Sequence, residues 1–250
     1  YKWHQLSEGG KHVAEALGGE RILPTTTDFR QKRALNVVEE MALASGMPVP
    51  PVYLLAHEKG INAFAAGNSP ADAVIGITQG GLDSFNREQL QGVIAHEFSH
   101  ILNGDMRLNL RLIALLNGIL FLGHCGRFLL RSGGFSSRSS RKGGGGRILI
   151  LAVGLAVVGA IGTFFGGLIK AAINRQREFL ADASAVQFTR NPGGIGGALK
   201  IIGGHAAGSR LLSANTDEAS HIFVSNALGS FAFFKTHPPL EDRIRRIDPN

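Results

Sequence analysis

The feature that most constrains this chain is a run of 22 uncharged residues, 148–169, in which Thr163 is the only clearly polar side chain. A helix of that length rises roughly 30 Å, which matches the hydrocarbon thickness of a bilayer. The alternative is a buried core helix, but buried helices seldom need so long an apolar run. The run therefore predicts a membrane-spanning helix or one arm of a membrane hairpin.

A second apolar segment, residues 112–126, precedes this run and is too short to span a bilayer comfortably by itself. We expect the two segments to pair as a hairpin. The residues between them, 128–147, are rich in Gly, Ser and Arg, which is typical of a flexible loop. Gly162 and Gly166 have the four-residue spacing that permits close contact between helices.

The net charge of +7 is unevenly distributed, because residues 106–177 contain eleven Lys or Arg and no Asp or Glu. This basic block is also the most apolar part of the chain, which favours a bilayer bordered by anionic lipid as its partner. Nucleic-acid binding is not expected, since the block lacks interleaved aromatic residues and any recognised motif. Six basic residues lie in the loop region and five on the other side, so the positive-inside rule does not orient the hairpin.

The rest of the chain predicts one α+β domain, made of residues 1–105 and 178–250 and interrupted by a hydrophobic, basic hairpin at residues 106–177. Asp28 and Asn86 are expected to cap two of its helices. The expected helices are 29–44, 87–103, 174–189, 195–202 and 240–247, and the expected strands are 52–56, 62–66 and 73–78. The chain begins with Tyr1, so we expect it to be a piece of a longer protein.

The sequence on the second of these helices reads His96-Glu97-Phe98-Ser99-His100. Two histidines four residues apart lie on one helix face, so both imidazoles can bind one metal ion. Glu97 is rotated by about 100° and can contact a metal-bound water without binding the metal itself. Packing or surface histidines are the alternative, but the apolar neighbours make an unpartnered Glu and His costly to bury. The pattern predicts a zinc site with His96 and His100 as ligands.

Tetrahedral zinc needs a third protein ligand and keeps its fourth position for water. The residues that follow His100 contain no further histidine nearby, so the third ligand is expected to be distant in sequence. Glu178 is the candidate, and Asp182, one helical turn later, is the candidate outer partner of a ligating histidine. The alternative for this pair is a solvated helix edge on which Arg175 and Arg177 form salt bridges.

These segments resemble the HtpX-like membrane zinc metalloproteases, which are relatives of the CAAX prenyl endopeptidases. The resemblance is carried by His96-Glu97-Phe98-Ser99-His100-Ile101-Leu102-Asn103-Gly104-Asp105-Met106, by Arg177-Glu178-Phe179-Leu180-Ala181-Asp182, by Thr236-His237-Pro238-Pro239-Leu240-Glu241-Asp242-Arg243-Ile244, and by Asn62-Ala63-Phe64-Ala65. It runs in order from about residue 30 to the end. The segment 222–228 only approximates the pattern of the family, and the hairpin loop is unusually basic and glycine-rich.

The resemblance implies a gluzincin-like fold, with a small β-sheet and an active-site helix, and Glu178 as the third ligand of one Zn²⁺ per chain. It also implies a bacterial inner membrane with the catalytic domain in the cytoplasm, and misfolded or membrane polypeptides as substrates. His237 and Arg243 lie in the C-terminal motif and are candidate donors to the oxyanion of the reaction. For His237 the alternative is a turn brace before two prolines, and for Arg243 it is a solvated face shared with Arg245 and Arg246. Homo-oligomerisation stays open.

The function that follows is a membrane-associated zinc endopeptidase in which Glu97 takes a proton from the attacking water and passes it to the departing amine. An extended substrate is expected to pair with the edge of strand 62–66 or strand 73–78. The competing hypothesis is a zinc-bearing membrane scaffold or chaperone adaptor that holds proteins without cutting them. A base at Glu97 argues against it, because a scaffold has no use for one.

Overall fold

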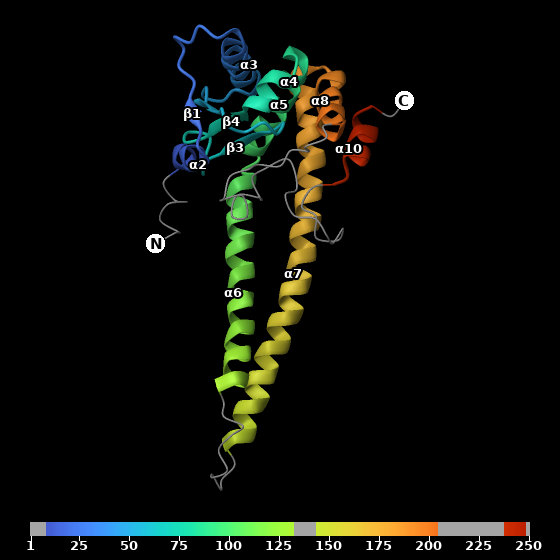
Figure 1. The fold of residues 1–250 in the computed structure, drawn as a ribbon. Helices are drawn as coiled ribbons and strands as arrows, with labels where there is room; N and C mark the ends of the chain where they lie inside the picture. Colours follow the sequence, from blue (N-terminus) through green and yellow to red (C-terminus); the bar gives the residue numbers. More distant parts are fainter. Residues whose placement is uncertain (1–8, 133–143, 205–237, 249–250) are drawn as a thin grey trace. The chain divides into compact units, whose positions relative to one another are not determined.

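The computed structural model describes residues 9–132, 144–204 and 238–248, and it divides into two units by their contacts. One unit joins Tyr1–Leu108 to Ile173–Asn250, and the other is Asn109–Ala172. The elements in chain order (Figure 1) are α2 (Gly10–Ala16), β1 (Glu20–Arg21), α3 (Phe29–Ser45), β2 (Val52–Leu55), β3 (Ala63–Ala66), β4 (Val74–Thr78), α4 (Gln79–Ser84), α5 (Arg87–Leu102), α6 (Asp105–Ser132), α7 (Gly144–Thr189), α8 (Pro192–Gly204) and α10 (Leu240–Ile247).

Local sequence chemistry sets the starts of the two helices that were expected to be capped. The carboxylate of Asp28 accepts from the N–H groups of Arg30 and Gln31 at the start of α3. At the start of α5, Asn86 and Gln89 form a capping box in which each side chain accepts from the backbone of the other. Both predicted caps are therefore confirmed.

The sheet has four strands in the order β1-β2-β4-β3. β1 pairs antiparallel with β2, β2 pairs parallel with β4, and β3 pairs antiparallel with β4. β3 is therefore an edge strand, whereas β4 has a partner on each side. An added substrate strand can therefore pair with residues 62–66. The alternative, pairing with residues 73–78, is wrong because both edges of β4 are already occupied.

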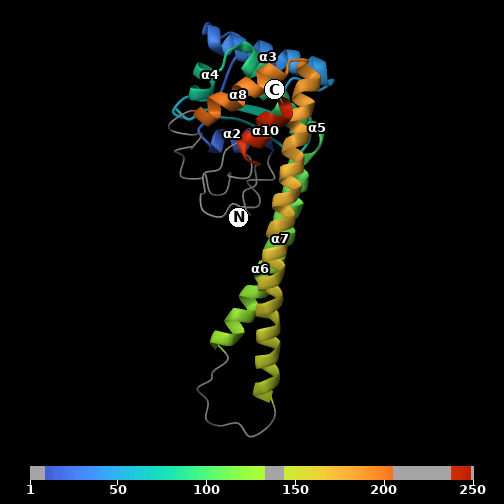
Figure 2. The same cartoon turned by 90° about the vertical axis from the view of Figure 1, so that its right-hand side faces the viewer.

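Alternate residues of each strand face two different apolar clusters, as the period of two in a strand requires. Tyr53, Leu55 and Phe64 pack with α2 on one face of the sheet. Val52, Leu54 and Ala65 pack on the other face, where α3, α4, α5 and α8 supply the remaining core. The larger cluster buries α5 between the sheet and α8, and Figure 2 shows α10 beside α8. The predicted α+β fold is confirmed.

The unit Asn109–Ala172 holds the arms of α6 and α7, which lie side by side. A Cβ at Gly126 would lie 2.5 Å from the N atom of Ala156, and one at Gly159 would overlap the Cα of Gly123. The predicted pair Gly162 and Gly166 also faces α6, against Ile119 and Leu116. Glycines thus bring the two helix backbones into contact.

The surface of this unit is apolar. Among the described residues, fourteen of the twenty exposed large apolar side chains lie in Asn109–Ala172. One described helix, over Leu149–Thr189, is long and apolar enough to cross a membrane, and only 11% of its most apolar stretch is buried. A core helix of a soluble protein would be mostly buried, so the exposure fits the expected membrane helix better.

Several helix boundaries differ from expectation, and the largest differences concern α6 and α7. Residues 174–189 are not a separate helix but the end of α7, which is continuous over 46 residues. Glycines such as Gly166 and Gly167 cost a helix only about 1 kcal/mol each relative to Ala, and no proline interrupts the segment, so nothing breaks it. The predicted loop over residues 128–147 is also too long, because α6 continues to Ser132 and α7 begins at Gly144. The segment 222–228, which only approximates the family pattern, lies outside the described residues.

We predict that Gly159→Leu destabilises the hairpin while Gly154→Leu does not. A side chain at Gly159 would collide with the backbone of α6, whereas no atom lies within 4 Å of a Cβ at Gly154. Overpacking of this kind costs about 1–3 kcal/mol. Circular dichroism melting in detergent is expected to show a lower Tm for the first variant only. Equal Tm values for the two variants would contradict the close approach of the helices.

Candidate metal centre

Helix α5 carries most of the candidate centre and is held rigidly. Gly92 lets α8 approach α5 closely, since a Cβ there would lie 2.5 Å from the N atom of Ile195. Val93, Ile94 and Phe98 anchor the apolar face of α5 in the core. One turn of this buried helix therefore presents His96, Glu97 and His100 at fixed positions, with His96 1% exposed and Glu97 2% exposed.

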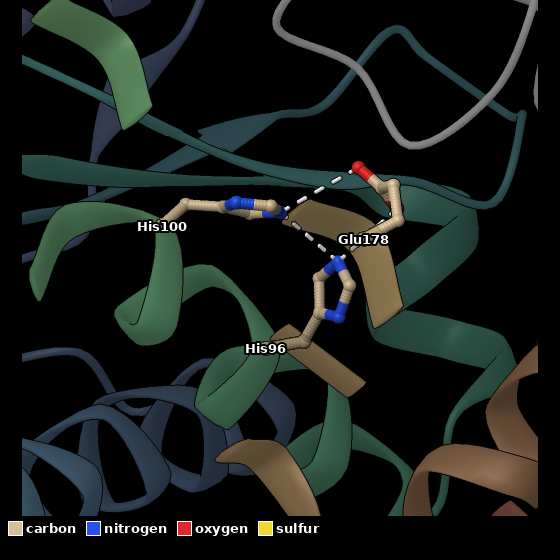
Figure 3. A group of neighbouring side chains, drawn as sticks. All are labelled: His96, His100 and Glu178. Carbon is tan, nitrogen blue, oxygen red and sulfur yellow. Dashed lines mark hydrogen bonds and ion pairs between the residues drawn. The ribbon is translucent and has the colours of Figure 1, made fainter. Parts of the chain in front are cut away.

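Three side chains from α5 and α7 point their donor atoms at one another (Figure 3). The Nε2 atoms of His96 and His100 are 3.2 Å apart. The Nε2 atom of His96 lies 3.6 Å from Oε2 of Glu178, and that of His100 lies 3.7 Å from Oε1. Glu178 is 5% exposed, so the alternative of a solvated helix edge is wrong.

These distances fit a tetrahedral metal site. Ligand atoms placed about 2.0–2.2 Å from one ion at tetrahedral angles lie about 3.3–3.6 Å from one another. The three donor atoms lie within 4.8 Å of one another and consist of two imidazole nitrogens and a carboxylate oxygen. This is a donor set that zinc and similar divalent metals accept, and it leaves one coordination position for another molecule.

Each histidine has a carboxylate at its other nitrogen. The Nδ1 atom of His96 lies 2.9 Å from Oδ1 of Asp182, and the Nδ1 atom of His100 lies 2.7 Å from Oδ2 of Asp105. A carboxylate at Nδ1 favours the tautomer that carries its hydrogen there, which leaves the Nε2 lone pair free to bind a metal ion. Asp182 thus lies where the sequence predicted an outer partner, whereas Asp105 was missed.

Asp105 reaches His100 across a short turn that directly follows α5. Gly104 adopts a left-handed backbone conformation with φ of 66°, which glycine tolerates best. Asp105 then begins α6 and faces back towards the last turn of α5. A glycine just after a predicted metal-binding helix, followed by an acid, is a signal that could have indicated this residue.

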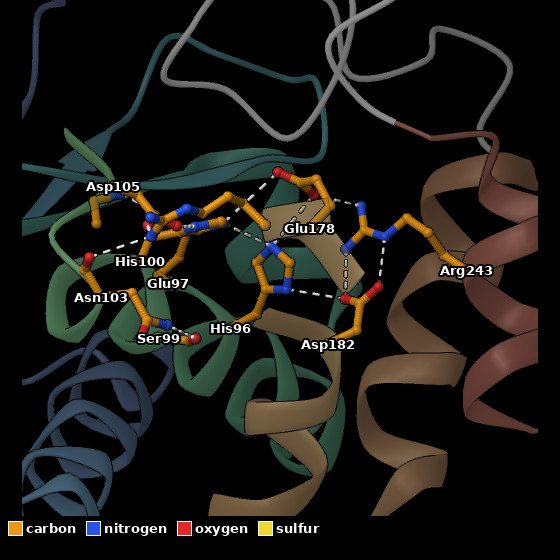
Figure 4. A network of polar contacts seen from close by, with 11 residues as sticks. His96, Glu97, Ser99, His100, Asn103, Asp105, Glu178, Asp182 and Arg243 are labelled. Carbon is orange, nitrogen blue, oxygen red and sulfur yellow. Dashed lines mark hydrogen bonds and ion pairs between the residues drawn. The ribbon is translucent and has the colours of Figure 1, made fainter. Parts of the chain in front are cut away.

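Arg243 of α10 is buried with 1% exposure and contacts two of the acids (Figure 4). Its Nε and Nη2 atoms donate to the two oxygens of Asp182 at 2.8 and 2.6 Å, and its Nη1 atom lies 3.2 Å from Oε2 of Glu178. The predicted alternative of a solvated face is therefore wrong for Arg243. Burial alone would lower the pKa of Arg243, but the hydrogen bonds and charges of Asp182 and Glu178 outweigh it and raise the pKa.

Glu97 lies beside His96, His100 and Glu178, and only one of its two carboxylate oxygens is hydrogen-bonded within the described part of the chain. Its Oε2 atom accepts from the backbone N–H of Ala65 in β3 at 2.9 Å. Its Oε1 atom is buried and has no hydrogen-bond partner in the described part of the chain. Burial, together with the negative charge of Glu178, raises the pKa of Glu97 to about 7, against the opposing effect of His100.

The two histidines differ in their affinity for a proton. Burial lowers the pKa of His96 despite the nearby carboxylate of Asp182. Burial acts in the same direction on His100, but the hydrogen bond to Asp105 and the charges of Glu178 and Glu97 outweigh it and raise its pKa to about 9. The imidazole of His96 is therefore neutral near pH 7 and can bind a metal ion directly, whereas the imidazole of His100 must first release a proton.

The charge of the cluster also fits a divalent cation. Four carboxylates, Asp105, Glu97, Glu178 and Asp182, face two guanidinium groups, Arg177 and Arg243. With neutral imidazoles this set carries a formal charge of −2, and buried charge is stable only when it is compensated. An ion of charge +2 would balance it, so the residues present fit a metal such as zinc.

The sequence predictions for the site thus fall into three groups. His96, His100, Glu178, Glu97 and Asp182 lie together, and Arg243 adjoins them through its carboxylate partners. Arg177 contacts Asp105 and donates to the carbonyl oxygen of Asn103, instead of forming the predicted salt bridge with Glu178 or Asp182. His237 lies outside the described residues.

Comparison with known proteins agrees with this geometry. Residues 28–249 match the sequence model of Peptidase family M48. The "Protease HtpX homolog" of Thermoanaerobacter pseudethanolicus is 42% identical over 216 residues, which cover 85% of this chain and 70% of that protein. The "Protease HtpX homolog" of Streptococcus uberis is 35% identical over 218 residues, which cover 85% of this chain and 71% of that protein.

A solved structure, "Crystal Structure of S. mikatae Ste24p", shares the fold with a TM-score of 0.59. The identity is 15%, and the match covers 94% of this chain and 53% of that one. This chain thus spans about half the length of that protein. At such low identity the likeness concerns the fold alone.

We predict that the affinity of the centre for a divalent metal rises with pH between about 6 and 9. His100 has a pKa of about 9 and must be neutral to bind a metal, so protons and metal compete for it below that pH. Chelator-competition titrations at several pH values are expected to show the rise, and calorimetry in buffers of different ionisation enthalpy is expected to show proton release. A pH-independent affinity would contradict the assignment of His100 as a ligand.

Proposed function

We propose a zinc-dependent, membrane-associated endopeptidase activity for this chain, which belongs to peptidase family M48. The family and the similar proteins support a metalloprotease that acts on polypeptides. That the metal is zinc, and how the reaction proceeds, are our proposal. The observation that carries the proposal is the convergence of His96, His100 and Glu178 beside a carboxylate oxygen of Glu97 that has no described partner.

When bound by His96, His100 and Glu178, zinc supplies a Lewis acid that lowers the pKa of a water molecule towards about 7 and polarises a peptide carbonyl. Glu97 then acts as the general base and acid. Its Oε1 atom accepts the proton of the attacking water and delivers it to the departing amine. Burial of Glu97 favours its protonated form, which suits a group that has to take up a proton during the reaction.

The backbone contact of Glu97 orients it for this role. Because Oε2 is held by the N–H of Ala65 on the edge strand, the carboxylate cannot rotate freely. A peptide that adds to the β3 edge would therefore lie next to the base. We propose this edge as the place where the substrate main chain binds.

Arg243 is better suited to positioning than to contact with substrate. All three of its guanidinium nitrogens face carboxylate oxygens of Asp182 and Glu178. It therefore holds a metal ligand and the partner of another ligand in place, and we assign it no direct contact with the oxyanion. His237 stays our candidate for that donor role.

The apolar surface of Asn109–Ala172 supports a membrane location. We propose the bacterial inner membrane, with the catalytic unit in the cytoplasm and misfolded or membrane proteins as substrates. The bilayer would contact residues 106–177, which we propose as the membrane-associated insertion between the two parts of the protease domain, residues 1–105 and 178–250.

We predict that Glu97→Gln lowers proteolysis of an unfolded protein such as casein by about 10²–10⁴-fold, because the amide cannot accept the proton. Zinc binding is expected to persist, since Glu97 is not among the three donor residues. The matched control is Glu88→Gln, an exposed acid in the first turn of the same helix. Full proteolysis by Glu97→Gln would refute the base assignment and favour the scaffold hypothesis.

Asn62 offers a second test of the substrate path. Its side chain is 2% exposed, and neither its Oδ1 nor its Nδ2 atom has a hydrogen-bond partner in the described part of the chain. Leaving such a buried group unpaired costs about 1–3 kcal/mol, so it is well placed to gain a partner when substrate binds. It lines a pocket with Ala63, Phe85, Val93, His96, Ile195, Leu199, Ile202 and Arg243.

We predict that Asn62→Ala lowers kcat/KM for peptide cleavage by about 10-fold, the effect of one lost hydrogen bond to substrate. Zinc affinity is expected to stay unchanged. Asn68→Ala is the control, because Asn68 makes its contacts to Asp72 and Arg107 through backbone atoms. Unchanged kcat/KM in Asn62→Ala would remove Asn62 from the substrate path.

A further inference from the structure

Asp105, the carboxylate partner of His100, also forms a polar contact with Arg177. One oxygen of Asp105 lies 2.7 Å from Nδ1 of His100, and the other accepts from Nη1 of Arg177. The same Nη1 atom donates to the carbonyl oxygen of Asn103 at 3.2 Å. Asp105 is 7% exposed, so the contact is shielded from water on the side of the carboxylate.

This arrangement fixes the plane of the Asp105 carboxylate. Because each oxygen has its own partner, the carboxylate cannot turn towards Arg177 without losing His100. The backbone around Asn103 and Gly104 is tied to the same guanidinium, which holds the turn that brings Asp105 to the histidine. A charge-assisted bond of this kind is stronger and more directional than a neutral one.

His100 needs such support more than His96 does. The side chain of His100 is 17% exposed, whereas that of His96 is 2% exposed. The surrounding protein therefore encloses the ring of His96, whereas part of the ring of His100 is exposed to solvent. Its contact with Asp105 is what holds Nε2 towards Glu178 and His96.

We propose that Asp105 and Arg177 are positioning residues, which hold the imidazole of His100 in the orientation that binds the metal ion. Arg177 directly precedes Glu178, so one turn of α7 supplies one ligand and, through Asp105, orients a second. The inference rests on the proposed function, since it requires His100 to be a metal ligand. Arg177 acts only through Asp105.

The test measures the zinc dissociation constant of the full chain in detergent by competition with a chromophoric chelator. Asp105→Asn is expected to weaken binding by about 10–100-fold, the usual effect of losing a hydrogen-bonded partner of a ligating histidine. Arg177→Gln is expected to weaken it less, by about 3–10-fold, because Asp105 keeps its charge. Asp83→Asn and Arg30→Gln are matched controls, since these two residues form an exposed pair on α4 and α3 and are expected to leave the constant unchanged.

Two further readouts separate positioning from a general loss of stability. If Arg177 acts through Asp105, Arg177→Gln has no further effect on the dissociation constant in the Asp105→Asn background. The visible spectrum of the cobalt-loaded protein, which reports ligand geometry, is expected to change in Asp105→Asn and Arg177→Gln and not in Asp83→Asn. Additive effects of the two substitutions, or unchanged cobalt spectra, would overturn the proposal.

The outcomes also distinguish this inference from the proposed function. If the unsubstituted chain binds no zinc, the proposed function fails; if it binds zinc and Asp105→Asn binds equally well, only the positioning role fails. Circular dichroism of the metal-free variants checks that they fold. Should Asp105→Asn not fold, Arg177→Gln and its rescue by Arg177→Lys decide the question, and equal affinity in all three chains would overturn the proposal.

Discussion

The site depends on the balance of charge inside a buried cluster. Glu97, Glu178 and Asp182 are each at most 5% exposed, and a group of carboxylates at such depth repels itself unless positive charge is supplied. Arg243 supplies part of it, and the raised pKa values of Glu97 and His100 favour the uptake of protons as a further source. A divalent cation held between the imidazoles and Glu178 would replace those protons. Metal binding and the acid–base behaviour of Glu97 are thus two consequences of one electrostatic constraint.

This constraint explains why distant segments converge. His96 and His100 come from α5, Glu178 and Asp182 from α7, and Arg243 from α10. Removing Arg243 would leave the buried carboxylates of Asp182 and Glu178 without their guanidinium partner, and breaking a buried ion pair in this way typically costs about 3–5 kcal/mol. The cluster therefore links α10 to α5 and α7. It stabilises the folded domain in addition to forming the site.

Much of the domain could be predicted from sequence because its signals are local. Asp28 and Asn86 cap their helices through contacts with residues two or three positions away, and the strands are short apolar runs bounded by turn residues. The pair His96 and His100 follows from helical periodicity alone. Assigning Glu178 as their partner needed more than periodicity, because 77 residues separate it from His100 in numbering and only the fold, or a family resemblance, brings the two together.

What sequence reasoning missed depends on tertiary structure. Asp105 reaches His100 only because Gly104 turns the chain back, and the burial of Arg243 depends on where α10 docks, although Arg245 and Arg246 beside it are typical of a solvated face. Likewise, residues 63–66 and 74–78 are both short, buried runs without charged residues, and only the strand order shows that β3 is the edge. The continuity of α7 was missed because Gly166 and Gly167, followed by charged residues after position 169, resemble a boundary but do not break a helix.

The central claim is that His96, His100 and Glu178 hold one metal ion. X-ray absorption at the zinc edge of the loaded chain tests it most directly, because imidazole ligands give a distinct multiple-scattering signal. The account predicts two imidazole nitrogens at about 2.0–2.1 Å and carboxylate oxygen at about 2.0–2.2 Å, with the imidazole signal halved in His100→Ala. A spectrum without imidazole scattering, or one unchanged by that substitution, would contradict it.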